Sequence, residues 1–338
     1  MTQPATPPQR VTVMGSGSWG TAFALVLTDA QNQVTLWARR AELAEKINAE
    51  HRNPDYFPTI SLPSSLRAMS DPQQAMDGAD FVVLAVPSQS LRANLKHWNL
   101  PEGAVVVSLA KGIEQGTGLR MSEVIAEAGG VSADRIAVVT GPNLAREIAE
   151  KQPSASVVAS ISPTTAEALQ RVCHTRTFRA YTNTDVVGCE LGGATKNVIA
   201  LAVGMAIGLG LGANATASVI TRGLAEISRL GVALGADPYT FSGLAGLGDL
   251  VATCSSPLSR NRTFGEELGR GRSVAEITAS SRQVAEGVRS CSSIQDLAAR
   301  HQVEMPIVEH VAAVIAGRLT PAEMITALMS RSAKPERY

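Results

Sequence analysis

Short apolar runs alternate with helical patterns in the first half of the chain. The apolar runs are rich in β-branched residues and predict strands at residues 11–14, 34–37, 81–86, 105–109, 136–140 and 156–159. Helical patterns lie between several of them, at residues 21–28, 41–50, 89–97, 118–128 and 164–173. Near-continuous apolar strands separated by helices are typical of a doubly wound, mostly parallel sheet.

From about residue 184 the pattern changes. Long Ala-, Leu- and Ile-rich helical patterns with glycine breaks occupy residues 188–212, 217–235, 263–268, 274–279, 288–301, 305–316 and 321–331. We therefore expect a Rossmann-type α/β domain followed by an all-α domain. The expected divisions are a disordered tail at 1–9, the α/β domain at 10–184, the helical domain at 185–331 and a second tail at 332–338.

The first predicted strand runs directly into a glycine-rich turn, Gly15-Ser-Gly-Ser-Trp-Gly20, which a helical pattern follows. In this G-x-G-x-x-G pattern Gly15 permits the tight turn, Gly17 lets a pyrophosphate approach the backbone, and Gly20 lets the helix pack close to the strand. The helix N-terminus offers its free N–H groups to phosphate. Because the motif stands between a strand and a helix, it favours dinucleotide binding over an ordinary strand–helix turn.

No charged residue occurs between residues 197 and 221, and this stretch is long enough to cross a bilayer. The same stretch contains Gly204, Gly208, Gly210 and Gly212 and several Ser, Thr and Asn residues. Such small residues suit close packing between helices. We therefore expect a buried helix of a globular domain and no transmembrane segment.

Composition narrows the classes of function. Lys+Arg and Asp+Glu both number 30, so the formal net charge of +0 gives no general attraction to nucleic acid or to an anionic membrane. The 4 cysteines form no C-x-x-C pair and the 5 histidines lack metal-ligand spacing, so neither a metal site nor a disulfide framework is expected. Residues 1–9 lack the apolar stretch of a signal peptide. These features predict a cytoplasmic protein.

The end of the second strand bears on the choice of cofactor. Folds that prefer NAD usually have an acidic residue there to hold the ribose 2′-hydroxyl, but this chain has Arg39 and Arg40. A guanidinium can pair with a 2′-phosphate, which favours NADPH. NADH stays a second option because Arg39 could stack on adenine, and the two arginines could also be an exposed pair without a ligand.

Two motifs follow later strands of the predicted sheet. Lys111 comes after the fourth strand, and Gly141-Pro-Asn143 comes after the fifth. Ligands of doubly wound sheets bind at the carboxyl ends of the strands, so both motifs are expected in the crevice. The ordinary alternatives are a surface lysine and a Gly-Pro turn that opens a helix.

Lys196 precedes the uncharged stretch, and we expect it at the start of a buried helix. Desolvation would lower its pKa and suit it to proton transfer near neutral pH. A snorkelling lysine that caps the helix is the alternative. A glycine-rich loop, residues 243–248, leads to Asp249, which is expected to begin a helix and could simply be its N-cap.

Ser259, Arg260 and Asn261 place a hydroxyl, a guanidinium and an amide within one short segment. This set can form a local phosphate clamp in a protein without net charge. A polar loop between two helices is the alternative.

Together the motifs resemble the NAD(P)-dependent glycerol-3-phosphate dehydrogenase family of the bacterial biosynthetic type, from residue 11 to about residue 327. The matching segments are residues 15–22, 84–88, 110–113, 141–145, 193–197, 243–250, 259–261 and 286–287. One departure is visible, because the family usually has Ser or Thr at the position of Asn143 and an aromatic residue at the position of Leu144.

The resemblance implies a role for each matching residue. Lys196 would be the catalytic proton donor and acceptor. The expected substrate contacts are Lys111, Gly141, Asn143, Lys196, Asp249, Ser259, Arg260 and Asn261. The expected cofactor contacts are Gly15, Gly17, Ser18, Trp19, Gly20, Arg39, Arg40, Lys111, Ala145, Arg260, Val284 and Glu286.

The implied reaction is the reversible reduction of dihydroxyacetone phosphate to sn-glycerol 3-phosphate by NAD(P)H, which supplies glycerophospholipid synthesis. A ketopantoate or hydroxyacid reductase of the same architecture would not need the clamp at Ser259–Asn261, because its substrate carries a carboxylate. A redox-sensing regulator would leave Lys196 and Asp249 idle and would show a basic face, against the neutral charge balance. The apolar helices of the second half could support a homodimer.

Overall fold

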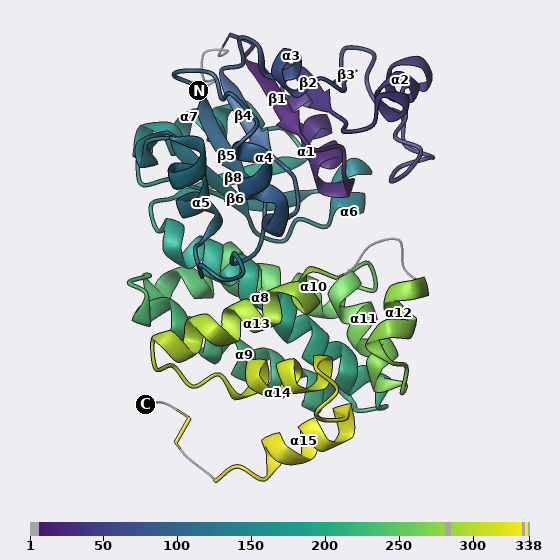
Figure 1. Ribbon diagram of the computed structural model, residues 1–338, viewed down its shortest axis with the longest axis vertical. Helices are drawn as coiled ribbons and strands as arrows, with labels where there is room; N and C mark the ends of the chain where they lie inside the picture. The colour runs from purple at the N-terminus through teal and green to yellow at the C-terminus, as the bar shows by residue number, and fades with distance from the viewer. Residues whose placement is uncertain (1–6, 281–284, 333–334, 337–338) are drawn as a thin grey trace.

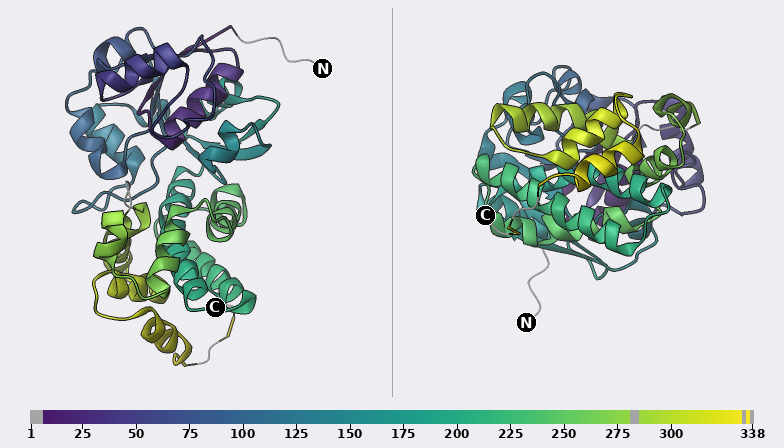
Figure 2. Two further views of the ribbon diagram at one scale, coloured as in Figure 1. Left: turned by 90° about the vertical axis from the view of Figure 1, so that its right-hand side faces the viewer. Right: turned by 90° about the horizontal axis from the view of Figure 1, so that it is seen from below.

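The computed structural model describes residues 7–280, 285–332 and 335–336, which form an α/β domain and a helical domain. The two domains are stacked along the long axis of the molecule, as two perpendicular views show (Figures 1 and 2). The predicted fold class, a doubly wound and mostly parallel sheet followed by an all-α domain, is confirmed.

One sheet of eight strands forms the first domain, in the order β3-β2-β1-β4-β5-β6-β7-β8. Every neighbouring pair is parallel except β6 and β7. Successive residues of the central strands face opposite cores, with Val83 and Val107 on one side and Val82 and Val106 on the other. Burial on both faces explains why these strands are almost continuously apolar. The strands are β1 (Arg10–Met14), β2 (Gln33–Trp37), β3 (Arg67–Met69), β4 (Phe81–Leu84), β5 (Val105–Ser108), β6 (Ile136–Thr140), β7 (Ser154–Ala159) and β8 (Phe178–Asn183).

Seven helices and two 3-10 turns connect the strands. The helices are α1 (Ser18–Asp29), α2 (Ala41–Glu50), α3 (Pro72–Met76), α4 (Leu91–Leu95), α5 (Met121–Gly129), α6 (Ala145–Ala149) and α7 (Pro163–Cys173), and the turns are η1 (Ser88–Ser90) and η2 (Ala133–Arg135). In α1 the side chains of Ala22, Phe23 and Leu27 are fully buried against the sheet. This packing fixes the N-terminus of α1 at the carboxyl end of β1.

A long central helix, α8 (Val186–Gly208), organises the second domain and packs against several of its other helices (Figure 1). Asp185 caps α8, because its carboxylate accepts the N–H of Gly188 at 2.8 Å. The remaining elements are α9 (Ala213–Ala233), η3 (Pro238–Ser242), η4 (Leu244–Gly248), α10 (Asp249–Ser255), α11 (Arg260–Gly269), α12 (Val274–Ser280), α13 (Glu286–Arg300), α14 (Pro306–Ile315) and α15 (Pro321–Met329).

Glycines let α8 and α11 touch through their backbones. A Cβ on Gly204 would lie 2.0 Å from the carbonyl oxygen of Arg262, and a Cβ on Gly265 would lie 2.1 Å from that of Leu201. Among the described residues one helix, α8, is long enough and apolar enough to cross a membrane. However, 89% of its most apolar window is buried inside the protein. The small residues therefore serve helix packing, as predicted.

Several predicted bounds need correction. Strands β3 and β8 were not predicted, and α11 begins at Arg260, so Arg260 and Asn261 lie in a helix rather than in a loop. Of the predicted tail 1–9, residues 1–6 lie outside the described part, but Gln9 is tied to the domain because its backbone N–H donates to Asn32 and its carbonyl accepts the N–H of Gln33. Gln9 is therefore joined to the α/β domain by hydrogen bonds of its backbone.

Candidate active site

The glycine-rich turn after β1 leaves room for a dinucleotide. Gly15 has φ +136°, and a Cβ there would lie 2.6 Å from the carbonyl oxygen of Ala85. A Cβ on Gly20 would lie 2.0 Å from the carbonyl oxygen of Gly15, so α1 could not approach the turn with a side chain there. A Cβ on Gly17 would meet nothing within 4 Å. The first and third glycines thus serve packing, while the second opens the space that a pyrophosphate needs.

The first turn of α1 presents donors to this space. Gly17 caps α1 without a side-chain hydrogen bond, so no side chain competes for the N–H groups at this helix end. The indole Nε1 of Trp19 is buried and has no hydrogen-bond partner among the described residues. A buried donor without a partner is costly unless a ligand accepts from it. The indole of Trp19 and the N-terminus of α1, which begins at Ser18, therefore fit a bound dinucleotide.

Arg39 and Arg40 lie on the surface directly after β2. Arg40 forms an ion pair with Asp55, whereas Arg39 has no ion pair within the described part of the chain. The two arginines are therefore not equivalent. Of the two guanidinium groups, that of Arg40 is neutralised by a carboxylate and, among the described residues, that of Arg39 is not.

Two lysines from different domains share one buried carboxylate. Lys111, which follows β5, donates from Nζ to Oδ2 of Asp249 at 2.6 Å, and Lys196 of α8 donates to the other oxygen of Asp249. The exposed fractions of the Asp249 and Lys196 side chains are only 1% and 7%. Lys196 also donates to the hydroxyl of Thr253 at 2.7 Å. The two predicted lysines and the predicted aspartate thus form one cluster.

The environment of Lys196 favours proton exchange near neutrality. Burial lowers the pKa of the Lys196 ammonium to about 8, although the Asp249 carboxylate acts in the opposite direction. The lysine lies within α8 rather than at its start, which corrects the sequence expectation. It therefore does not cap the helix, and with its amine buried on a carboxylate it does not snorkel to water.

A short π-helix, η4, delivers Asp249 to this cluster. It spans the predicted glycine-rich loop and runs into α10, whose first residue is Asp249. Gly248 rather than Asp249 is the N-cap, and both carboxylate oxygens of Asp249 bind lysines. The alternative interpretation of Asp249 as a helix cap is therefore wrong.

At Gly193 the backbone of α8 lies close to Thr140 of β6 and to Lys111. A Cβ on Gly193 would lie 3.4 Å from Cγ of Lys111 and 2.9 Å from the hydroxyl of Thr140. The amine of Lys111 also donates to the carbonyl of Gly141 at 3.1 Å. A side chain at residue 193 would thus collide with Thr140, and the Lys111 amine bridges the Gly141 carbonyl and Asp249.

The first turn of α11 brings the predicted phosphate clamp next to the lysines. Ser259 caps α11, because its Oγ accepts the N–H of Arg262 at 3.3 Å. Asn261 bridges two elements, since its Nδ2 donates to Asn197 at 2.9 Å and its Oδ1 accepts the N–H of Gly287 at 2.9 Å. A helix N-terminus with a guanidinium is a suitable anion site.

Glu286, the first residue of α13, faces the same cluster. Burial raises the pKa of its carboxyl group, while the positive charges of Arg260, Lys111 and Lys196 oppose that rise. Glu286 therefore lies within electrostatic range of these three cations. Val284, the other cofactor residue predicted in this segment, lies outside the described residues.

Two of the predicted contact residues lie just after β6. Asn143 donates from Nδ2 to the hydroxyl of Ser156 at 3.0 Å, and its Oδ1 is buried without a partner among the described residues. Ala145 begins α6 and is partly exposed. The amide nitrogen of Asn143 is thus bonded to β7, whereas its Oδ1 is available to accept a hydrogen bond from a ligand.

Two residues of the cluster were not assigned a role from the sequence. Thr253 binds the amine of Lys196, and Asn197 holds Asn261 while its own Nδ2 is buried without a partner among the described residues. Both lie within or near motifs that were recognised. The spacing of four residues between Asp249 and Thr253 could have indicated that both lie on one face of a helix.

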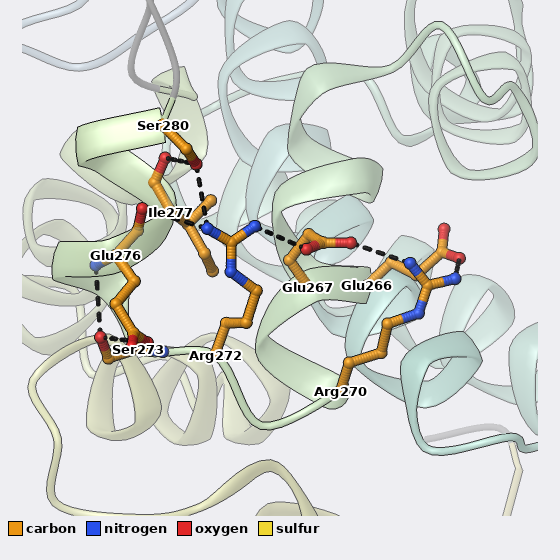
Figure 3. A network of polar contacts seen from close by, with 8 residues as sticks. All are labelled: Glu266, Glu267, Arg270, Arg272, Ser273, Glu276, Ile277 and Ser280. Carbon is orange, nitrogen blue, oxygen red and sulfur yellow. Dashed lines mark hydrogen bonds and ion pairs between the residues drawn. The ribbon is translucent and has the colours of Figure 1, made fainter.

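A surface hollow of about 360 Å³ lies beside the clamp, between α11 and α12, and Arg260, Glu267 and Arg272 contribute to its lining. Arg272 lines this hollow and donates hydrogen bonds to Glu267 at 2.8 Å and to Ser280 at 3.1 Å (Figure 3). These contacts join α12 to α11. No group of three or more His, Cys, Asp or Glu side chains within the described ranges could hold a metal ion.

A dinucleotide crevice that faces a buried lysine–aspartate cluster defines a two-domain, nicotinamide-dependent dehydrogenase. Residues 10–166 match the family model described as NAD-dependent glycerol-3-phosphate dehydrogenase N-terminus, and residues 185–326 match the one described as its C-terminus. The chain belongs to the NAD-dependent glycerol-3-phosphate dehydrogenase family.

Full-length relatives agree with this assignment. The chain is 62% identical over 334 residues to a glycerol-3-phosphate dehydrogenase of the NAD(P)+ type from Streptomyces griseus, covering 98% of this chain and 99% of the relative. It is 60% identical over 329 residues to one from Corynebacterium aurimucosum, covering 96% and 99%. The predicted family, enzyme class and cofactor type are thereby confirmed.

Solved structures of this family resemble the chain more closely than those of reductases with the same architecture. A glycerol-3-phosphate dehydrogenase structure from Coxiella burnetii superposes with a TM-score of 0.91 at 35% identity, covering 97% of this chain and all 100% of that one. A ketopantoate reductase structure from Ralstonia eutropha gives 0.57 at 16% identity, with coverage of 94% and 99%. The second likeness shows the fold alone.

Proposed function

We propose that the protein catalyses the reversible reduction of dihydroxyacetone phosphate to sn-glycerol 3-phosphate, with NADPH as the preferred reductant, and that it supplies glycerophospholipid synthesis. The observation that carries the proposal is the buried Lys196–Asp249 pair next to the N-terminus of α11 with Arg260. This arrangement combines a proton donor with a cationic site for a phosphate. The names of the relatives support the same substrate.

The residues divide the chemistry between them. When bound, the nicotinamide supplies a hydride, with its electron pair, to the carbonyl carbon. The Lys196 ammonium donates a proton to the carbonyl oxygen, so the ketone gains one hydride and one proton and becomes an alcohol. Asp249 and Thr253 hold the amine in place, and in the oxidation the neutral amine takes the hydroxyl proton.

The phosphate is held away from the reacting carbon. Arg260, Asn261, Ser259 and the N–H groups at the start of α11 would bind it, and Lys111, Gly141 and Asn143 would contact the rest of the substrate. Binding energy from a remote phosphate can be used to orient the carbonyl group. We assign cofactor contacts to Gly15, Gly17, Ser18, Trp19, Gly20, Arg39, Arg40, Lys111, Ala145, Arg260, Val284 and Glu286.

An absorbance assay of reduced nicotinamide tests the function and the cofactor together. We expect oxidation of NADPH with dihydroxyacetone phosphate, slower oxidation of NADH, and little with unphosphorylated 2-keto acids. Arg39→Ala should reduce the preference for NADPH, because its guanidinium would pair with the 2′-phosphate. Faster turnover of a 2-keto acid such as ketopantoate would overturn the substrate proposal.

The wider setting is also proposed. We propose domains at 10–184 and 185–331, a cytoplasmic location and a homodimer. The described cysteines are all buried and free, which fits a reducing compartment. Val232 and Tyr239 expose apolar side chains that a second copy of the chain would cover in such a dimer. Light scattering on a sizing column tests the dimer, and a monomeric mass would contradict it.

A further inference from the structure

A buried carboxylate on α8 faces the sheet domain and has no part in the chemistry above. The Glu190 side chain is 3% exposed. Its Oε1 accepts the backbone N–H of Ser122 at 2.8 Å, and its Oε2 accepts the hydroxyl of Ser122 at 2.5 Å and Nη1 of Arg120 at 2.8 Å. All three donors lie at the N-terminus of α5. One carboxylate therefore makes three hydrogen bonds across the domain boundary.

The contact between Glu190 and α5 is buried, unlike an ion pair on the protein surface. A buried carboxylate is unfavourable unless its lone pairs are satisfied, and removal of one partner leaves a charge without compensation. Burial raises the pKa of the Glu190 carboxyl group, while Arg120 and Ser122 oppose the rise. The bonds thus require one relative placement of α8 and α5.

The segment that leads to α5 also spans both domains. We call residues 109–120, between β5 and α5, the strap. The strap carries Lys111 near its start and ends at Arg120, which pairs with Ile113 in an isolated β-bridge. Ile113 is fully buried in the core of the helical domain. The strap therefore belongs to the sheet domain by sequence and to the helical domain by packing.

Helix α13 holds the middle of the strap. Arg300 donates to the carbonyls of Thr117 at 2.8 Å and Gly116 at 3.1 Å, and Gln115 donates to the carbonyl of Arg289 at 2.9 Å. With Glu190 at one end and Lys111 on Asp249 at the other, the strap is fixed to the helical domain along its length.

We propose that Glu190 is a positioning residue for hydride transfer. Glu190 and Lys196 lie on the same helix, so the bonds of Glu190 to α5 set where α8 places the Lys196 amine relative to the crevice of the sheet domain. They also anchor the strap, which keeps Lys111 on Asp249. This inference rests on the proposed function, because it concerns the geometry of that reaction. A misplacement of about 1 Å can lower a rate about 100-fold.

Glu190→Gln tests the role with little change of shape. One acceptor oxygen becomes an amide donor that faces other donors. We expect kcat for dihydroxyacetone phosphate to fall by about 10- to 100-fold. The deuterium isotope effect with NADPH labelled at the transferred hydrogen should rise, because hydride transfer would limit the rate. NADPH affinity, measured by fluorescence titration, should stay within about threefold, since the intact sheet domain holds most of the dinucleotide.

Glu123→Gln is the matched control. Within the described structure Glu123 also binds Arg120, but its carboxylate makes no hydrogen bond to the helical domain. Glutamine can keep its helix-capping contact. This variant should retain kcat and the wild-type isotope effect. Ser122→Ala removes a single bond of Glu190 and should give an intermediate loss of kcat, and it carries the test if Glu190→Gln does not fold.

The outcomes separate the inference from the proposed function. Failure of the wild-type enzyme to reduce dihydroxyacetone phosphate would overturn the proposed function. Amide hydrogen exchange then decides the inference by itself, because Glu190→Gln should speed exchange in the strap while Glu123→Gln should not. A purely structural role would lower the melting temperature without changing kcat per folded molecule or the isotope effect, and that result would overturn the inference. An equal loss in Glu123→Gln would overturn it as well.

Discussion

Lys111 and Asp249 come from different domains, yet Nζ of the lysine donates to the aspartate at 2.6 Å. Lys196 binds the other oxygen of the same carboxylate, so one buried negative charge holds two ammonium groups. The two domains therefore meet at the Asp249 carboxylate. Any change to Asp249 is expected to affect proton transfer and domain contact together.

Asp249→Asn should lower both activity and stability. The asparagine leaves two ammonium groups facing each other without a counter-charge. Removal of one partner of a buried ion pair costs about 3–5 kcal/mol, and we expect kcat to fall at least about 100-fold because the acid loses its position. Urea unfolding and steady-state kinetics measure the two effects. A variant with kcat within a few-fold of wild type would contradict the proposed role.

Lys196→Ala should abolish proton donation and spare the cofactor. A positioned acid contributes about 100- to 10,000-fold, so kcat should fall by at least about the lower value. NADPH binding should be nearly unchanged, which a fluorescence titration measures. Lys151→Ala, at an exposed lysine that pairs with Asp29, serves as the control and should keep full turnover. Comparable turnover in the two variants would show that Lys196 is not the acid.

The two directions of the reaction should respond oppositely to pH. With the pKa of Lys196 lowered by burial to about 8, the ammonium acid predominates below that pH and the neutral base above it. Reduction should therefore lose kcat/KM above about pH 8, by about tenfold per pH unit. Oxidation should rise toward that pH and then level off. Parallel pH profiles in both directions would speak against proton exchange at Lys196.

Arg260→Ala should mainly raise the KM for dihydroxyacetone phosphate. The loss of a guanidinium from the phosphate site removes a charge-assisted hydrogen bond, worth about 1.5–3 kcal/mol, which corresponds to roughly a 10- to 150-fold increase. Arg270 lies at the other end of α11 and pairs with Glu266 and Glu267 (Figure 3). The control variant Arg270→Ala should therefore leave KM unchanged. An unaltered KM in Arg260→Ala would remove the clamp assignment.

The sequence predicted the parts of the fold that have a strong local signal. The turn Gly15–Gly20 and the apolar strands around it are short-range patterns with a physical cause. Strand β8 was missed although Phe178 and Ala180 alternate with exposed neighbours, because the alternation is brief. Strand β3 has only three residues and little periodicity to detect.

The site was harder to predict than the fold. Lys111 and Asp249 are separated by 138 positions, and no local sequence pattern indicates that one carboxylate binds two lysines. The sequence named these residues through family resemblance, but their pairing depends on the long-range packing of α8 and α10. Glu190 opens the segment that contains Lys196, but the sequence indicated no role for it, because its contacts lie in the other domain.

Gly204→Ala should destabilise the helical domain, because α8 and α11 touch through their backbones. The new methyl group would lie 2.0 Å from the carbonyl oxygen of Arg262, which cannot turn aside as a flexible side chain would. Overpacking of this kind costs about 1–3 kcal/mol. It would also displace the start of α11, so we expect a higher KM for the phosphate substrate in addition to a lower midpoint in urea. Gly212→Ser is the control, since its Cβ meets nothing within 4 Å and serine is a favourable residue at the N-cap of α9. Equal stability of Gly204→Ala and Gly212→Ser would mean that the two helices can separate without cost, and the close glycine contact would then not position the clamp.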